Sequence, residues 1–127
     1  MVGDVGICKR RCGRHFAVRI WTDAYPPYEL LEDVCVAGLV VPKGFMFDGA
    51  SVPRFARPFF DRLGRNALAA LVHDYMYATG CRPRREADRI LYDLLVEQRV
   101  SVCKAWIVWM AVRLFGVRRW TMKRLEL

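Results

Sequence analysis

The stretch LVHDYMY at residues 71–77 decides how the second half of this chain folds, together with EADR at residues 86–89. In the first stretch a histidine and an aspartate interrupt an apolar run. The run belongs to a longer segment, residues 62–78, whose apolar positions recur every three or four residues. That spacing predicts a helix, and Gly80 is a plausible stop. The two polar residues inside it mark either a functional site or an unusually polar core.

Two more helices are expected to follow. Pro83 opens a segment near residues 84–99 whose apolar positions again repeat at helical spacing. A third helix is predicted over residues 101–115, with Ser101 as its N-cap and Gly116 at its end.

The first half of the chain has the character of strands. It is rich in β-branched and aromatic residues, and turn residues separate three strand-like runs: residues 15–21, 28–31 and 34–41. Such short spacings suit antiparallel hairpins better than crossover units. The sequence therefore predicts an α+β fold, with N-terminal antiparallel β-hairpins followed by about three packed helices.

Length and composition indicate one folded domain over residues 1–127, because 127 residues can build one core and the apolar fraction is 54%. We expect residues 1–14 to form an arm and residues 116–127 to form a docking tail. The net charge of +8 favours an anionic partner. No apolar run is long enough to span a membrane. The five cysteines form no C-x-x-C pair, and we expect reduced thiols in a protein made in the cytoplasm.

Three side chains of the two helices are candidates for one site. His73 and Tyr77 are four residues apart and therefore share a helix face, whereas Asp74 is rotated by about one hundred degrees from His73. Asp88 lies at the border of the apolar stripe of the next helix, where a carboxylate needs a hydrogen-bond partner. A facing imidazole would be that partner, and the carboxylate would fix its tautomer and raise its basicity.

The same three residues also describe a buried hydrogen-bond cluster that ties two helices together without any chemistry. On the residues alone this structural interpretation is favoured over the catalytic one.

The chain resembles a family of small proteins of unknown function encoded largely by tailed phages and prophages. The resemblance rests on VPKGFMFDGASVPR at residues 41–54, HDYMY at residues 73–77 and EADR at residues 86–89. It covers most of the chain, about residues 16–120. It implies a phage context, in which other virion proteins are the expected partners and the virion is a further location.

A more distant resemblance is to the small bacterial and fungal phospholipase A2 enzymes, which also have an Asp-Gly-x-Ser turn before a helical His-Asp-x-x-Tyr. It implies that His73 is a general base, Asp88 its orienting partner and Tyr77 a member of the same catalytic set. It also implies calcium, held by Asp74 together with Asp48, Gly49 and Ala50. A hard cation of this kind takes oxygen ligands and polarises an ester carbonyl.

Two functions from different classes follow. The first is a calcium-dependent carboxylic ester hydrolase that acts on phospholipid of the host membrane at entry or lysis. The second is a non-enzymatic virion component, such as a tail, baseplate or head-associated subunit. Nucleic acid is an alternative anionic partner that no motif supports.

One geometric test separates the two functions. For the enzyme, His73 Nδ1 should lie within hydrogen-bond reach of an Asp88 oxygen, while Asp74 and Asp48 converge on one oxygen-lined point. If Asp88 pairs instead with an arginine and the loop that contains Asp48 points away, the structural interpretation is favoured.

Overall fold

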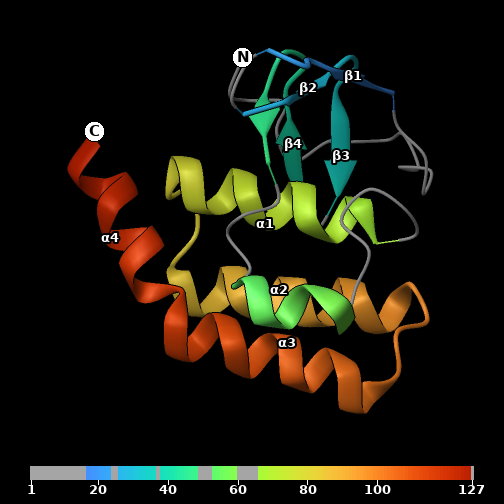
Figure 1. Cartoon of the computed structure of the whole chain (residues 1–127), viewed down its shortest axis with the longest axis vertical. Coiled ribbons are helices and arrows are strands. Elements are labelled where there is room, and N and C mark those ends of the chain that lie inside the picture. The colour runs from blue at the N-terminus through green and yellow to red at the C-terminus, as the bar shows by residue number, and fades with distance from the viewer. Residues whose placement is uncertain (1–16, 24–25, 37, 49–52, 60–65, 127) are drawn as a thin grey trace. The chain divides into compact units, whose positions relative to one another are not determined.

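The computed structural model describes residues 17–23, 26–36, 38–48, 53–59 and 66–126. The chain divides into two compact units, Met1–Asp48 and Gly49–Leu127, and each is described by itself. Strands make up the first unit and helices the second (Figure 1). The α+β class predicted from the sequence is therefore confirmed.

The described residues of the first unit form two small antiparallel sheets. In the first, β2 (Tyr28–Leu30) lies between β1 (Val18–Ile20) and β5 (Met46–Phe47), with Val18 opposite Leu30 and Tyr28 opposite Phe47. The second is the hairpin of β3 (Val34–Val36) and β4 (Leu39–Val41). Among the described residues of this unit, the buried apolar side chains are Leu30, Val34, Leu39, Val41 and Phe47.

Cys35 on β3 is disulfide-bonded, so the expectation of reduced thiols is wrong for this residue. Cys81 and Cys103 in the second unit are free and exposed, as that expectation requires. Cys8 and Cys12 lie outside the described residues.

Where the structure describes it, the second unit contains the 3₁₀ helix η2 (Arg54–Phe59) and four α-helices. These are α1 (Ala67–Thr79), α2 (Arg84–Glu97), α3 (Val102–Phe115) and α4 (Val117–Glu126). α2 contacts both α1 and α3, while α4 contacts α1 and α3, and η2 packs on α3. None of the described helices is long and apolar enough to cross a membrane.

The helix boundaries follow the local signals of the sequence. Gly80 ends α1 in the left-handed conformation at φ 66°, where glycine carries no Cβ penalty, and its N–H donates to the carbonyl of Met76. The Ser101 hydroxyl accepts a hydrogen bond from the N–H of Lys104, which confirms the predicted N-cap of α3.

The sequence predicted about three helices, and the structure adds a fourth, α4, at residues 117–126. Gly116 ends α3 but keeps right-handed helical angles, so the chain turns there and continues as a helix. Arg124 of α4 donates from Nη2 to the carbonyl oxygens of Tyr77 and Ala78, at 2.8 and 3.1 Å. A cation at the negative end of a helix is favourable, so the expected tail is tied to the end of α1.

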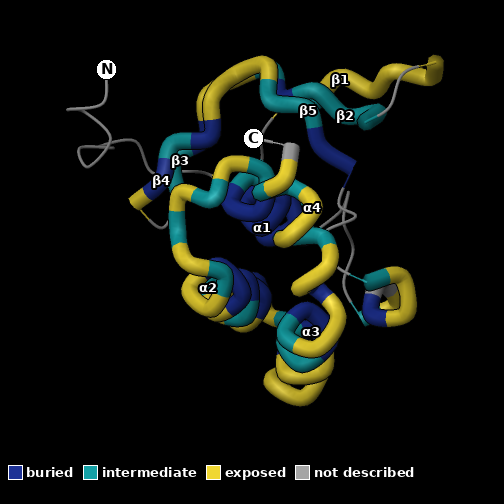
Figure 2. Tube along the Cα trace, turned by 90° about the vertical axis from the view of Figure 1, so that its left-hand side faces the viewer, coloured by how far each residue is buried: buried dark blue, intermediate teal, exposed yellow. Residues whose placement is uncertain are grey.

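α1 is the most deeply buried helix of this unit, with buried residues from Leu68 to Asp74 and again at Met76 and Tyr77 (Figure 2). The apolar residues of α1 lie on nearly all sides of the helix, which is typical of a helix in a protein core. α2 is amphipathic instead and buries one side, at Ala87, Leu91, Leu94 and Leu95. The two polar groups that α1 and α2 bury opposite each other, His73 and Asp88, form the candidate site.

Candidate functional site

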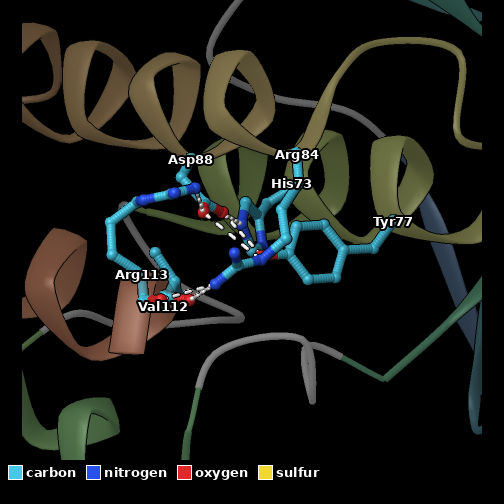
Figure 3. A network of polar contacts seen from close by, with 6 residues as sticks. All are labelled: His73, Tyr77, Arg84, Asp88, Val112 and Arg113. Atoms are coloured by element: carbon cyan, nitrogen blue, oxygen red, sulfur yellow. Dashed lines mark hydrogen bonds and ion pairs between the residues drawn. The ribbon is translucent and has the colours of Figure 1, made fainter. Parts of the chain in front are cut away.

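The candidate site lies where α1, α2 and α3 meet (Figure 3). His73 and Tyr77 are one turn apart on α1, and their ring centres are 4.3 Å apart. Asp88 lies on α2, and Arg113 reaches the same point from the last turn of α3. Hence three helices contribute to a cluster that no single helix could form.

Asp88 is the centre of this cluster. Its Oδ1 lies 2.8 Å from Nε2 of His73 and accepts a hydrogen bond of 2.7 Å from the Tyr77 hydroxyl. Its Oδ2 accepts a hydrogen bond of 2.9 Å from Nη1 of Arg113. Both His73 and Asp88 are completely buried. Burying a carboxylate is costly unless its oxygens are hydrogen-bonded, and here both oxygens are.

The network shifts the acidity of two members. Burial alone would raise the pKa of Asp88, but the hydrogen bonds from His73, Tyr77 and Arg113 and the attraction of His73 outweigh it, so the pKa is lowered. Asp88 is therefore ionised at neutral pH. An ionised carboxylate only accepts hydrogen bonds, which means that Nε2 of His73 carries the hydrogen in their contact. The pKa of Tyr77 is raised well above its usual value, first by burial and then by the negative charge of Asp88.

Arg84 reinforces the same place from the first turn of α2. Its Nη2 donates to the carbonyl oxygens of Val112 and Arg113, at 3.0 and 2.5 Å, and so caps the end of α3. Its Nε lies 4.0 Å from Oδ2 of Asp88. The carboxylate thus holds one arginine by a hydrogen bond and a second by charge.

The shifted pKa of Tyr77 predicts a fall in stability at alkaline pH. Because the pKa of this hydroxyl is higher in the folded chain, the unfolded chain loses its proton first as the pH rises above about 10. The stabilisation is present below that pH and is lost above it, by up to about 1.4 kcal/mol per pH unit. Urea unfolding at pH 9 and pH 11 should show a smaller fall in Tyr77→Phe than in the unaltered chain.

The control for this measurement is Tyr92→Phe, since Tyr92 is half-buried on α2 with Arg89 over its ring. An equal alkaline fall in Tyr77→Phe and in the unaltered chain would contradict the assignment of this loss to Tyr77.

The sequence analysis placed His73, Tyr77 and Asp88 together, and the structure does so. The sequence analysis named the wrong nitrogen of His73. It expected Nδ1 to face Asp88, but in the structure Nε2 does. One part of the outcome that would favour the structural interpretation, an arginine on Asp88, occurs in Arg113, but beside His73 and not in its place. The pair and the arginine are thus present in one network. Residues 49–52 of the loop that contains Asp48 lie outside the described residues.

The residues predicted to hold calcium are divided between the two units, and their role as calcium ligands stays a prediction. Asp74 is a buried residue of α1, and Asp48 is a buried residue after β5 in the other unit. Gly49 and Ala50 lie outside the described residues. Among the residues that the structure does describe, no three His, Cys, Asp or Glu side chains gather in a way that could hold a metal ion.

Sequence reasoning missed Arg84 and Arg113 as members of the site. Arg84 precedes Asp88 by four residues, a spacing that pairs opposite charges on one helix, so a signal for it was present. Arg113 is separated from Asp88 by 25 residues and belongs to another helix. Nothing local marks that contact, since it depends on how α3 packs on α2.

Comparison with known proteins places the chain in a family. No curated protein and no solved structure matches it. Residues 27–112 match the family described as "Protein of unknown function (DUF1353)". This range includes four of the five residues of the site and ends one residue before the fifth, Arg113. The matched range is more than half of the chain. The chain therefore belongs to the DUF1353 family.

Proposed function

We propose that this chain is a hydrolase in which His73 is the general base and Asp88 its orienting partner. The observation that carries the proposal is the buried hydrogen bond of 2.8 Å between Nε2 of His73 and Oδ1 of Asp88. With the hydrogen on Nε2, the lone pair of the imidazole is on Nδ1. Tyr77 donates to the same carboxylate oxygen and so restricts the position of the carboxylate.

In the proposed reaction, Nδ1 of His73 takes a proton from water, and the water oxygen attacks the carbonyl carbon of an ester. The imidazolium is stabilised by the negative charge of Asp88. It returns the proton to the alkoxide as the bond between that oxygen and the acyl carbon breaks. The products are a carboxylic acid and an alcohol.

The substrate class, a phospholipid ester, comes from the resemblance to phospholipase A2. Asp74, with a buried carboxylate one residue after His73, has the oxygen donors that calcium prefers and is the described residue of the second unit that would hold it. When bound, the cation would polarise the ester carbonyl. The need for calcium is tested by adding a chelator, and the role of His73 is tested by substituting it.

The test of this function is fatty-acid release from phosphatidylglycerol vesicles, measured with calcium and again with a chelator. His73→Gln should lower the rate at least about 100-fold, since general bases contribute factors of this size. His15→Gln changes the other histidine of the chain and is the matched control. Circular dichroism melting of both variants separates loss of chemistry from loss of folding. No release from vesicles in the presence of calcium, or equal rates in His73→Gln and the unaltered chain, would overturn the proposal.

A second candidate is a non-enzymatic virion component in which the cluster only fixes the helix packing. The observation that favours it is that both carboxylate oxygens of Asp88 are already hydrogen-bonded, one to His73 and the other to Arg113. His73 is also completely buried. The phage context comes from the resemblance described for the sequence. Mass spectrometry of purified particles from a phage that encodes this chain should then detect it in a fixed copy number, and its absence there would count against this candidate.

A further inference from the structure

The outer face of α3 carries an apolar stripe. Val102, Trp106, Met110 and Leu114 follow one another at intervals of four residues, so they line one side of the helix. Val102, Trp106 and Leu114 are 59%, 53% and 61% exposed, and Ile107 beside them is also exposed. The opposite side of α3 is buried, at Ala105, Val108 and Val112 (Figure 2).

Large exposed apolar side chains that form a continuous stripe usually mark a binding surface, whereas scattered ones need no explanation. α3 is apolar on both sides, and packing against α2 and η2 accounts for only one of them. Among the described residues of the second unit, the outer stripe therefore stays exposed to a partner.

The segment that forms α3 and α4 is rich in positive charge. Residues 98–127 contain seven basic residues and one acidic residue, Glu126. Arg113 is paired with Asp88 and Arg124 with the end of α1, whereas Lys104 in the first turn of α3 is exposed. A partner that buries the stripe must therefore also tolerate or attract positive charge, which favours an anionic surface.

A hollow of about 760 Å³ borders the stripe and is lined by Pro83, Arg85, Glu86, Arg89 and Trp109. Trp109 follows Trp106 by three residues, so the hollow and the stripe are neighbours on the surface of α3. Arg85 and Arg89 are one turn apart on α2 and are both exposed. Arg89 is paired with the exposed Asp93 at 3.2 Å, and an exposed pair of this kind is weak enough for a phosphate group to replace. Two guanidinium groups beside an indole suit a phosphate group, because arginine forms bidentate hydrogen bonds to phosphate.

Neither a second copy of this chain nor nucleic acid fits this surface as well as lipid. Two copies joined through the stripe would bring the exposed Lys104 and Arg85 of both chains into one interface, and like charges there would oppose the contact. Nucleic acid would satisfy the arginines but would leave Val102, Trp106 and Leu114 against phosphate and water. A bilayer offers an apolar boundary for the stripe and anionic headgroups for the basic residues.

We propose that the outer face of α3 binds an anionic lipid membrane. α3 lies in the plane of the membrane surface with Val102, Trp106, Ile107 and Leu114 below the headgroups, and Arg85 and Arg89 hold a lipid phosphate. A helix of 14 residues is about 21 Å long, so it lies along a surface and does not cross it. The proposal stands on this surface alone and holds whether or not His73 is catalytic.

Flotation of the full chain with vesicles tests it. We expect binding to vesicles of phosphatidylcholine and phosphatidylglycerol, and at least about tenfold weaker binding to phosphatidylcholine alone or at high salt. Trp106→Ser combined with Leu114→Ser should weaken binding about tenfold or more. Because both side chains are exposed, the variant should keep its fold, as checked by circular dichroism. Arg85→Gln with Arg89→Gln should weaken binding to the anionic vesicles and should leave the weak binding to phosphatidylcholine unchanged.

Met122→Ser on α4 is the matched control, because Met122 is 52% exposed and Trp106 is 53% exposed. It should bind as the unaltered chain does. Absence of binding to anionic vesicles would overturn the proposal, and so would an equal loss in Met122→Ser. Sedimentation without vesicles tests whether a second copy binds the stripe instead. A dimer that dissociates in Trp106→Ser would assign the stripe to a second copy and would also overturn the proposal.

Discussion

Asp88→Asn is expected to destabilise the second unit by about 3–5 kcal/mol, which is the usual cost of removing one partner from a buried charged pair. The amide keeps the size of the side chain but loses its negative charge. Arg113 then loses its ion pair. The buried Nε of Arg84, which has no hydrogen-bond partner in the described part of the chain, loses the charge 4.0 Å away from it. For a unit of this size we expect Tm to fall by about 12 °C or more.

Asp93→Asn provides the control for this measurement. Asp93 lies on the same helix as Asp88 and is paired with Arg89 at 3.2 Å, but both of these side chains are largely exposed. An exposed pair at this spacing contributes about 0.3–0.5 kcal/mol. Guanidinium unfolding of the two variants compares the buried and the exposed carboxylate directly. Similar losses in both would show that the cluster around Asp88 contributes no more than a surface ion pair.

Gly116→Ala is expected to destabilise the chain by about 1–3 kcal/mol, through overpacking. Its backbone is right-handed helical, a conformation that alanine adopts readily, so any loss is steric. A Cβ there would lie 2.7 Å from the hydroxyl of Tyr77 and would also meet the carbonyl oxygen of Val112. Neither neighbour moves freely, because Asp88 holds the hydroxyl and Arg84 holds the carbonyl.

A double-mutant cycle with Tyr77→Phe makes this prediction specific. Removing the hydroxyl removes one of the two close contacts, so Gly116→Ala should cost less in Tyr77→Phe than in the unaltered chain. We expect a coupling of about 1 kcal/mol from urea unfolding of the four proteins, within the range seen for residues in contact. Strictly additive losses would mean that the alanine methyl group does not meet Tyr77.

The pairing of His73 with Asp88 could be predicted because each residue stood out within its own helix. His73 interrupts an apolar run and Asp88 borders an apolar stripe, so both had to be buried, and buried polar groups need partners. The choice of nitrogen could not be predicted. It depends on the rotamer of His73 and on the distance between α1 and α2, neither of which the spacing of residues specifies.

The fourth helix shows a different limit. Gly116 is a valid stop signal, and α3 does end there. The residues beyond it are rich in arginine, which by itself is equally compatible with a solvated tail. α4 is held by contacts with a distant helix, through the hydrogen bonds of Arg124 to the end of α1 and the edge-to-face contact of Trp120 with Tyr77. Tertiary contacts of this kind commonly outweigh local propensity.

The sequence by itself determined the α+β class, the positions of the three central helices, the N-cap at Ser101 and the partnership of His73, Tyr77 and Asp88. These features depend on periodicity, capping and the cost of burying polar groups, which act within one helix or between neighbouring helices. Only the tertiary structure decided that Arg113 forms the hydrogen bond to the second carboxylate oxygen of Asp88 and that one apolar face of α3 remains exposed. Both features depend on the packing of helices that are far apart in the sequence, and local sequence patterns do not specify the distances between such helices.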